Sequence, residues 1–247
     1  MIYYIIILLV IITLFIILKS FKQFDNFDNF DNFENFDIYV ITLKNEDRIN
    51  NINKQQEKID LPIQIFDAVN GKKLNLNDYK IGSGFKSNEN YRKREVGCYL
   101  SHYNIYKKCK KTGYTIVFED DFSIDVDNLI NKINNSIEKL KNANVDFDIM
   151  FIGNHAWNDK HGNLIVDDLY KIGNYEGLGG THAYVINNKN INKIINESSN
   201  IDEPIDVKIQ KMADEGKLNV IKTYPYYVNT IDSPSTIATG ENFTNYN

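Results

Sequence analysis

Three adjacent carboxylates, Glu119-Asp120-Asp121, follow directly on an apolar run from Ile116 to Phe118 that is typical of a strand. A buried strand cannot carry unpaired negative charge into a core, so we expect the cluster at the carboxyl edge of that strand, beside a cleft. Because side chains alternate along a strand, Glu119 and Asp121 should point to one side and Asp120 to the other. Such an acid-x-acid pair predicts a divalent metal site that also holds a pyrophosphate, with a solvated turn or helix N-cap as the alternative.

Four further segments with chemistry-bearing residues flank the acidic cluster. They are Phe66-Asp-Ala-Val-Asn-Gly71, Glu95-Val-Gly-Cys-Tyr-Leu-Ser-His102, Gly180-Thr-His-Ala-Tyr184 and Pro204-Ile-Asp206. In this order and spacing, from about Asp37 to Ile237, they resemble glycosyltransferase family 25, which includes lipooligosaccharide and collagen hydroxylysine galactosyltransferases. The resemblance implies an inverting transferase that moves a hexose, galactose or glucose, from a UDP-sugar to a glycan or a hydroxylated protein acceptor. It also implies Mn²⁺ or another divalent cation as the cofactor, held by Glu119 and Asp121.

An inverting transferase needs a general base, and Asp206 is the candidate that the resemblance favours. One carboxylate must take the proton from the acceptor hydroxyl as this hydroxyl attacks the sugar. Asp202 and Glu203 are the neighbouring rivals for this role. Asp206 also begins a helix-like run after Pro204, so a carboxylate that only stabilises a helix N-terminus is the structural alternative.

The candidate donor-binding residues are Arg48, Glu119, Asp120 and His182. Arg48 follows the first expected strand, where its guanidinium could bind phosphate through two hydrogen bonds, although an exposed helix arginine is nearly as good an interpretation. Glu119 could hold the metal or the ribose, and Asp120 could instead cap the segment that follows. The glycines before His182 allow a ligand to approach the backbone, and this histidine offers a donor or a metal ligand.

Glu95, Ser101 and His102 are candidates for acceptor binding or for a structural role. Glu95 and His102 lie seven residues apart on one expected helix, which places them two turns apart on one face. A single histidine on a helix is more often a packed, hydrogen-bonded residue than a catalyst. We expect Tyr184 to share a face with His182 and to belong to the core.

Strands and helices alternate in the remaining sequence. The expected strands are Asp37–Leu43, Ile63–Val69, Tyr114–Glu119 and Phe147–Ile152, the expected helices are Asn45–Ile59, Arg94–Lys111 and Val126–Lys141, and a loop-rich hairpin region covers Gly153–Gly177. This alternation predicts an α/β fold with a mostly parallel sheet, helices on both faces and ligands at the carboxyl ends of the strands. It agrees with the GT-A-like fold that the resemblance implies, in a single domain covering residues 37–247.

The N-terminal segment predicts a membrane anchor and a linker. Ile2 to Leu18 is almost entirely apolar and Lys19 follows, so residues 1–20 read as a single-pass transmembrane signal-anchor, with a cleaved signal peptide as the alternative. The following lysines place the domain in the cytosol, whereas Golgi-type glycosyltransferases face the lumen, so the side of the membrane stays open. Residues 21–36 repeat Phe-Asp-Asn and read as a low-complexity linker, or alternatively as a helix with a phenylalanine stripe.

Composition excludes some functions and leaves others open. The net charge of −5 and a pI near 5.4 provide no basic surface for a nucleic-acid partner. Cys98 and Cys109 would stand about 16 Å apart on one helix, too far for a disulfide, and read as core residues. A metal-dependent phosphotransferase or nucleotidyltransferase would use similar carboxylates. A degenerate family member that binds glycans or partners without catalysis is the non-enzymatic alternative.

Overall fold

A computed structural model describes residues 36–156, 162–173 and 178–231. The expected anchor and almost all of the expected linker lie outside these residues. Among the helices that are described, none combines the length and the apolar character needed to cross a membrane. The anchor and its orientation therefore stay predictions.

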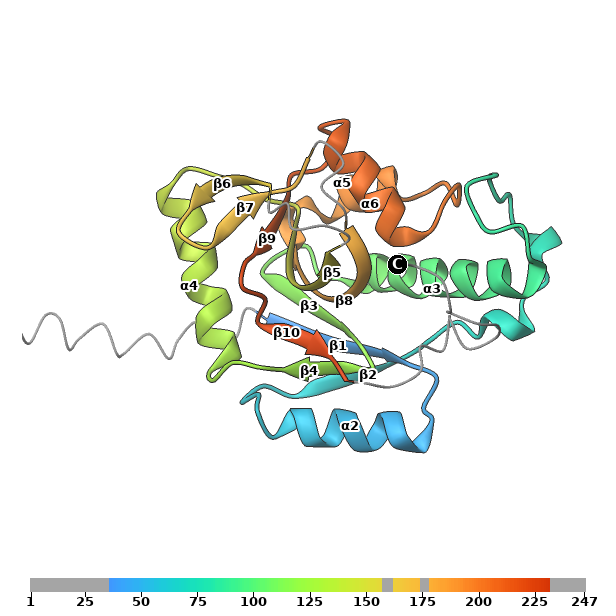
Figure 1. The fold of residues 1–247 in the computed structure, drawn as a ribbon, viewed down its shortest axis with the longest axis horizontal. Helices are drawn as coiled ribbons and strands as arrows, with labels where there is room; N and C mark the ends of the chain where they lie inside the picture. The colour runs from blue at the N-terminus through green and yellow to red at the C-terminus, as the bar shows by residue number, and fades with distance from the viewer. Residues whose placement is uncertain (1–35, 157–161, 174–177, 232–247) are drawn as a thin grey trace, which may run out of the picture. The chain divides into compact units, whose positions relative to one another are not determined.

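The centre of the fold is an eight-stranded sheet with the order β2-β1-β3-β8-β5-β9-β7-β6 (Figure 1). Its strands are β1 (Phe36–Thr42), β2 (Ile63–Asp67), β3 (Tyr114–Glu119), β5 (Ile149–Ala156), β6 (Asn163–Val166), β7 (Leu169–Lys171), β8 (Leu178–Asn187) and β9 (Val220–Thr223). The four strands expected from the sequence correspond, in chain order, to β1, β2, β3 and β5. The α/β class is confirmed.

The sheet is mixed, which corrects the expectation of a mostly parallel one. The pairs β1–β2, β1–β3 and β5–β9 are parallel, whereas β8 is antiparallel to both β3 and β5. The hairpin of β6 and β7 adds two more antiparallel pairings at the other edge. Because β8 runs in the opposite direction, its N-terminal end lies beside the carboxyl end of β3, where the acidic cluster begins.

Helices surround this sheet, and side chains are buried on both of its faces. The helices are α2 (Glu46–Gln56), α3 (Glu89–Lys108), α4 (Leu129–Asn142), α5 (Ile191–Glu197) and α6 (Ile205–Asp214), with short 3₁₀ turns at η3 (Gly71–Lys73), η4 (Leu76–Asp78) and η5 (Asn188–Asn190). Ile41 and Val117 belong to the core cluster that also contains residues of α3, α5 and α6. Val40 and Phe118 alternate to the opposite face and are equally buried, which is the pattern of a sheet covered on both sides.

A second, two-stranded sheet closes the fold near the acidic cluster. Its strands are β4 (Phe122–Ile124) and β10 (Val228–Thr230), which are antiparallel. Directly beyond β10, the backbone N–H of Ile231 donates a 2.8 Å hydrogen bond to the carbonyl of Asp121. The Asn51 side chain of α2 donates to the carbonyl of Phe122, which ties α2 to the same strand. The acidic cluster therefore continues into a small sheet that the C-terminal part of the described chain completes.

The largest differences from the expected element boundaries are in α3 and β5. Helix α3 begins at Glu89 rather than Arg94, because the Asn88 side chain caps it by accepting a hydrogen bond from the Tyr91 N–H. Strand β5 begins at Ile149 and continues to Ala156, through residues that the sequence assigns to a loop. Its extension is supported by pairing with β8 across register shifts, which a local apolar pattern does not reveal.

Candidate active site

Glu119 lies at the end of β3 and is held by groups from two other elements. Its Oε1 accepts a 2.7 Å hydrogen bond from the hydroxyl of Thr181 on β8 and lies 3.3 Å from Nε2 of His102 on α3. His102 is fully buried, and its Nδ1 lies 2.7 Å from the Tyr184 hydroxyl. Burial raises the pKa of Glu119, but the bonds from His102 and Thr181 outweigh it, so this pKa falls below its usual range. Glu119 is therefore a carboxylate at neutral pH.

Asp120 and Asp121 share the guanidinium of Arg48. Nε of Arg48 lies 3.5 Å from Oδ1 of Asp120, and Nη1 lies 3.5 Å from Oδ2 of Asp121. Arg48 is only 4% exposed, so it is a buried partner of the acidic cluster rather than an exposed helix arginine. Burial, together with the charge of Glu119, raises the pKa of Asp121 to about 6, although Arg48 opposes this shift. The cluster thus holds more negative charge than Arg48 alone neutralises.

The unbalanced charge makes Glu119 and Asp121 suitable ligands for a divalent cation. Oδ1 of Asp121 is buried and has no hydrogen-bond partner among the described residues. A buried carboxylate oxygen without a partner is costly, and a cation would remove that cost. Carboxylate oxygens are the ligand type that Mg²⁺ and Mn²⁺ favour. These two residues are therefore chemically suited to hold a cation, and the metal pair itself stays a prediction.

Asp120 contacts the end of β1 rather than the segment that follows it. Burial raises its pKa, whereas hydrogen bonds from the Thr42 side chain and the Leu43 backbone, together with Arg48, oppose that change. The interpretation of Asp120 as a cap for the following segment is therefore replaced by a link between the ends of β3 and β1. Asp120 and Glu119 both line one cavity.

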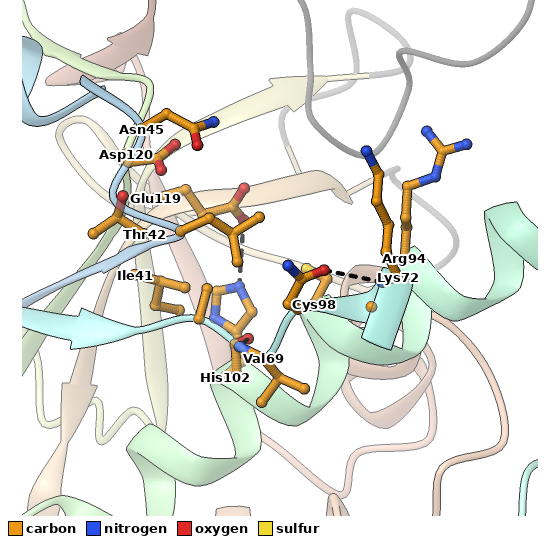
Figure 2. Close-up of a pocket in the computed structure, with 15 residues that line it drawn as sticks. Ile41, Thr42, Asn45, Val69, Lys72, Arg94, Cys98, His102, Glu119 and Asp120 are labelled. Atoms are coloured by element: carbon orange, nitrogen blue, oxygen red, sulfur yellow. Dashed lines mark hydrogen bonds and ion pairs between the residues drawn. The ribbon is translucent and has the colours of Figure 1, made fainter. Parts of the chain in front are cut away.

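This cavity has a volume of about 390 Å³ and opens beside the carboxyl ends of β1, β2 and β3 (Figure 2). Its lining residues are Ile41, Thr42, Leu43, Asn45, Ala68, Val69, Asn70, Gly71, Lys72, Arg94, Cys98, Ser101, His102, Glu119 and Asp120. In Figure 2, Lys72 and Arg94 lie on one side of the cavity and Glu119 and Asp120 on the other. The cavity therefore offers cationic groups across from a carboxylate pair, and polar and apolar side chains both line it.

Two glycines bring the loop after β2 against α3 and so form one wall of the cavity. A Cβ atom on Gly97 would lie 2.8 Å from the carbonyl oxygen of Val69, and one on Gly71 would lie 2.3 Å from that of Lys93. Neither position accepts a side chain without displacing backbone. The Asn70-Gly71 pair that the sequence assigns to a turn is thus also a contact with the helix.

Ser101 and Glu95 fasten loops to α3. Ser101 Oγ accepts a 2.9 Å hydrogen bond from the Val69 N–H and donates one of 2.7 Å to the Gly97 carbonyl. Glu95 accepts a 3.1 Å hydrogen bond from the Lys86 N–H, and burial raises its pKa. Ser101 lines the cavity and Glu95 does not. Their observed contacts are structural, while the acceptor contacts considered from the sequence stay predictions.

His182 lies close to the acidic cluster but does not make the contact to Glu119 that its neighbour Thr181 makes. It is 3% exposed, and its ring centroid lies 4.8 Å from that of His155 on β5. Burial lowers the pKa of His182 to about 4, against the attraction of Glu119, so the ring is neutral at pH 7. Tyr184 makes its contacts with His102 in the core, as expected of a core residue.

Asp206 lies in the first turn of α6 and reaches the segment that carries Thr181. Its Oδ2 accepts a 3.0 Å hydrogen bond from the Gly180 N–H. The two rival carboxylates form ion pairs with lysines of α6. Asp202 pairs with Lys208 at 2.7 Å, and Glu203 pairs with Lys211 at 3.2 Å. Of these three carboxylates, Asp206 contacts Gly180, which directly precedes the Thr181 that bonds to Glu119.

Sequence reasoning missed several residues of the site. Thr181 stands inside the Gly180-Thr-His-Ala-Tyr184 segment, but alternation along a regular strand gives no reason to prefer it over His182. Cys98 lines the cavity, although its position on a helix reads as core. Lys72 directly follows the Asn70-Gly71 turn, and this position beside a strand end is the signal that could have identified it.

Comparison of the sequence with known proteins identifies the same family that the five sequence segments resemble. The profile described as "Glycosyltransferase family 25 (LPS biosynthesis protein)" matches residues 35–209. Procollagen galactosyltransferase 1-A of Xenopus laevis is 27% identical over 128 residues, covering 47% of this chain and 21% of that protein. Procollagen galactosyltransferase 2 of Homo sapiens is 24% identical over 169 residues, covering 64% and 27%.

A third relative carries a different name. The "Probable inactive glycosyltransferase 25 family member 3" of Rattus norvegicus is 27% identical over 127 residues, covering 47% of this chain and 22% of that protein. The matches with these relatives thus span roughly a fifth to a quarter of their lengths.

Proposed function

The chain belongs to glycosyltransferase family 25, and we propose that it is an active, metal-dependent, inverting hexosyltransferase that uses a UDP-sugar. The observation that carries this proposal is the position of Glu119 and Asp121. They lie at the end of β3, Glu119 lines a cavity of about 390 Å³, and one Asp121 oxygen has no hydrogen-bond partner among the described residues. A sugar nucleotide needs both a cavity for the nucleoside and a charged site for the pyrophosphate.

The two parts of the donor would bind to different sides of this region. The nucleoside would occupy the cavity between the loop after β2 and α3, where Asn45 and Asn70 offer hydrogen-bonding groups. Glu119 and Asp121 would hold a divalent cation such as Mn²⁺, which would neutralise the pyrophosphate and stabilise it as a leaving group. Arg48 would keep Asp120 and Asp121 in place rather than grip phosphate.

Asp206 is the proposed general base for the acceptor hydroxyl. Its contact with the Gly180 N–H places the carboxylate beside the segment that carries Thr181 and His182. A carboxylate retains further lone pairs after it accepts a hydrogen bond, so this contact leaves it able to take a proton. Neutral His182 would contact the sugar or the metal from the same segment. Glu95, Ser101 and His102 would support the site through the loops and through Glu119.

Galactose or glucose is the proposed sugar, and a glycan or a hydroxylated protein side chain is the proposed acceptor. The names of two relatives, both procollagen galactosyltransferases, support UDP-galactose and a protein acceptor as the first pair to test. We also propose that residues 1–20 anchor the chain in a membrane, on the strength of their apolar composition. Protection of the domain from added protease in intact vesicles would test the anchor and its orientation.

UDP release from a panel of UDP-sugars tests the catalytic proposal. The full chain is assayed with and without Mn²⁺, beside Asp121→Ala and the exposed control Asp60→Ala. Sugar-selective, Mn²⁺-dependent release that Asp121→Ala abolishes and Asp60→Ala retains is the expected result. Release that is independent of the metal and of Asp121 would overturn the proposed site.

A non-catalytic binding protein is the second candidate, because one relative is named as probably inactive. Such a protein would release no UDP with any donor or acceptor. It would also show no Mn²⁺-linked UDP binding in calorimetry, and Asp121→Ala would leave its partner binding intact. Binding of UDP that requires Mn²⁺ would favour the transferase and direct the search to the acceptor.

A further inference from the structure

Glu119 faces a second group of metal-binding side chains besides Asp121. The Sγ atom of Cys98, a ring nitrogen of His102 and a carboxylate oxygen of Glu119 all lie within 4.8 Å of one another. Cys98 and His102 stand four residues apart on α3, so they lie on one face of the helix. All three residues line the cavity, which gives a dissolved ion a route to them (Figure 2).

The donor atoms of this triad differ in kind from those of the acidic cluster. One thiol, one imidazole and one carboxylate form a ligand set for Zn²⁺, which takes three protein ligands and leaves one position open at accessible sites. Ions such as Mn²⁺ favour oxygen ligands, whereas a thiolate favours softer metals. Glu119 therefore belongs to two groups of opposite preference, one with Asp121 and one with Cys98 and His102.

The surroundings of His102 suit a metal ligand. A metal-binding histidine commonly donates its other N–H to a neighbouring acceptor, which fixes the ring and its tautomer. Nδ1 of His102 lies 2.7 Å from the Tyr184 hydroxyl, which can accept that proton. The Tyr184 hydroxyl in turn lies 3.5 Å from the Tyr106 hydroxyl and can donate to it. Nε2 of His102 lies 3.3 Å from Oε1 of Glu119 and 3.1 Å from the Thr181 hydroxyl oxygen. An ion on the Glu119 side would take the place of these two contacts, and the remaining ring proton would then lie on Nδ1 beside Tyr184.

We propose that Cys98, His102 and Glu119 bind Zn²⁺ or another thiophilic divalent ion, and that this ion competes with the donor's cation for Glu119. On binding, the S–H bond of Cys98 breaks, a sulfur–metal bond forms and the proton passes to the buffer, with no change of oxidation state. Binding of the ion follows from the geometry of the triad alone. Inhibition of the transferase by that ion rests on the proposed function.

Cobalt substitution tests the binding step. The full chain is titrated with Co²⁺ and no donor, and the near-ultraviolet absorption that arises from thiolate-to-cobalt charge transfer is followed. Cys109 supplies a matched control, because it is the second free cysteine, at the end of the same helix. We expect the band in the native chain and in Cys109→Ala and its loss in Cys98→Ala, with Zn²⁺ affinity weakened at least about tenfold.

Two spectroscopic outcomes would overturn the proposal. One is the absence of a thiolate band in the native chain at saturating Co²⁺, and the other is a band that persists in Cys98→Ala. Cys98→Ser provides a second variant of similar volume, and circular dichroism establishes that each variant is folded. The first outcome is measured on the native chain alone, so it overturns the proposal whether or not the variants fold.

The inhibition step is measured separately as Zn²⁺-dependent loss of UDP release at a fixed Mn²⁺ concentration. Native chain and Cys109→Ala should be inhibited at the same Zn²⁺ concentration, and Cys98→Ala should need about ten times more. Equal inhibition of all three proteins would refute the competition for Glu119. If the chain releases no UDP from any donor, the proposed function fails while the cobalt spectrum still decides the metal site.

Discussion

The hydroxyl of Thr181 on β8 donates a 2.7 Å hydrogen bond to Oε1 of Glu119 at the end of β3. The two residues are 62 positions apart in the chain and meet because β8 lies antiparallel to β3. Together with His102, this bond keeps Glu119 ionised and fixes the direction of its carboxylate. The hydrogen bond therefore joins the acidic cluster to the segment that Asp206 contacts.

Thr181→Val should lower the kcat/KM for UDP-sugar about tenfold. Valine keeps the shape of threonine but removes the donor, and the loss of one hydrogen bond to a charged group corresponds to about 1.5 kcal/mol. Thr181→Ser, which retains the hydroxyl, should stay close to the native value. Steady-state kinetics at saturating Mn²⁺ measures the difference. A valine variant with native kcat/KM would mean that Glu119 needs no such support.

Asp121→Asn should abolish UDP release without weakening the fold at pH 7. The folded-state pKa of Asp121 is raised to about 6, so the stability linked to its protonated form is present below about pH 4 and lost as the pH rises through 6. The neutral amide escapes this loss. The stability of the variant relative to the native chain should therefore increase by about 2 kcal/mol between pH 4 and 7.

Urea unfolding in the presence of EDTA measures this difference at each pH. EDTA removes any cation that would neutralise Asp121 in the native chain. The exposed Asp60→Asn control should follow the native chain at every pH. If Asp121→Asn is less stable than the native chain at pH 7, the charges of Glu119 and Asp121 do not destabilise the native fold as proposed.

Asp168→Asn should destabilise the protein by about 1–2 kcal/mol at pH 7, because Asp168 links three elements. Its carboxylate pairs with Lys139 of α4 at 3.0 Å and accepts a 3.0 Å hydrogen bond from the Tyr227 hydroxyl. Burial raises its pKa, but these two bonds outweigh burial and lower it. The stabilisation is therefore present above about pH 4 and lost as the pH falls through the lowered pKa.

Thermal unfolding between pH 3 and 7 measures the effect of Asp168. The difference between the native chain and the variant should shrink at the acidic end of the range. Asp167→Asn is the control, since its side chain is 64% exposed although it contacts the same lysine. Equal destabilisation by both variants would assign the effect to Lys139 rather than to the half-buried Asp168 carboxylate.

Gly97→Ala should weaken UDP binding at least about tenfold and lower stability by about 1–3 kcal/mol. The added methyl group would meet the Val69 carbonyl at 2.8 Å and push the loop away from α3, which enlarges the cavity. Gly173→Ala is the control, because a Cβ atom there meets nothing within 4 Å. Calorimetry with UDP and Mn²⁺ measures binding. Native affinity in Gly97→Ala would show that the loop does not contribute to the nucleotide site.

The sequence predicted the elements whose apolar patterns are local. β3 is found at its expected residues, and the boundaries of α2 and α4 differ from the expectation by a few residues. The acidic cluster was correctly placed at a strand end because unpaired charge cannot enter a core. The strand β8 was not among the expected strands. Its direction could not have been predicted either, since periodicity does not indicate which neighbour a strand pairs with or in which sense.

The site residues show the same division between local and long-range information. Arg48 and Asp120 were identified as charged groups near strand ends, but their mutual pairing depends on the contact of α2 with β4. Thr181 gained its role from a register shift between β5 and β8, which no spacing rule encodes. Cys98 lies on the cavity wall where Gly71 of the loop and Gly97 of α3 approach each other closely, and sequence spacing does not reveal this contact.

The hydrogen bond from Ile231 to Asp121 has a consequence for the order of synthesis. The ribosome adds Ile231 110 positions after Asp121, so at about 5–20 residues per second the carboxylates emerge about 5–20 s before the residue that bonds to the Asp121 backbone. A nascent chain stalled before β10 therefore exposes these carboxylates to cellular cations before the fold is complete. Metal ions present during translation would therefore be able to bind to a partly synthesised chain.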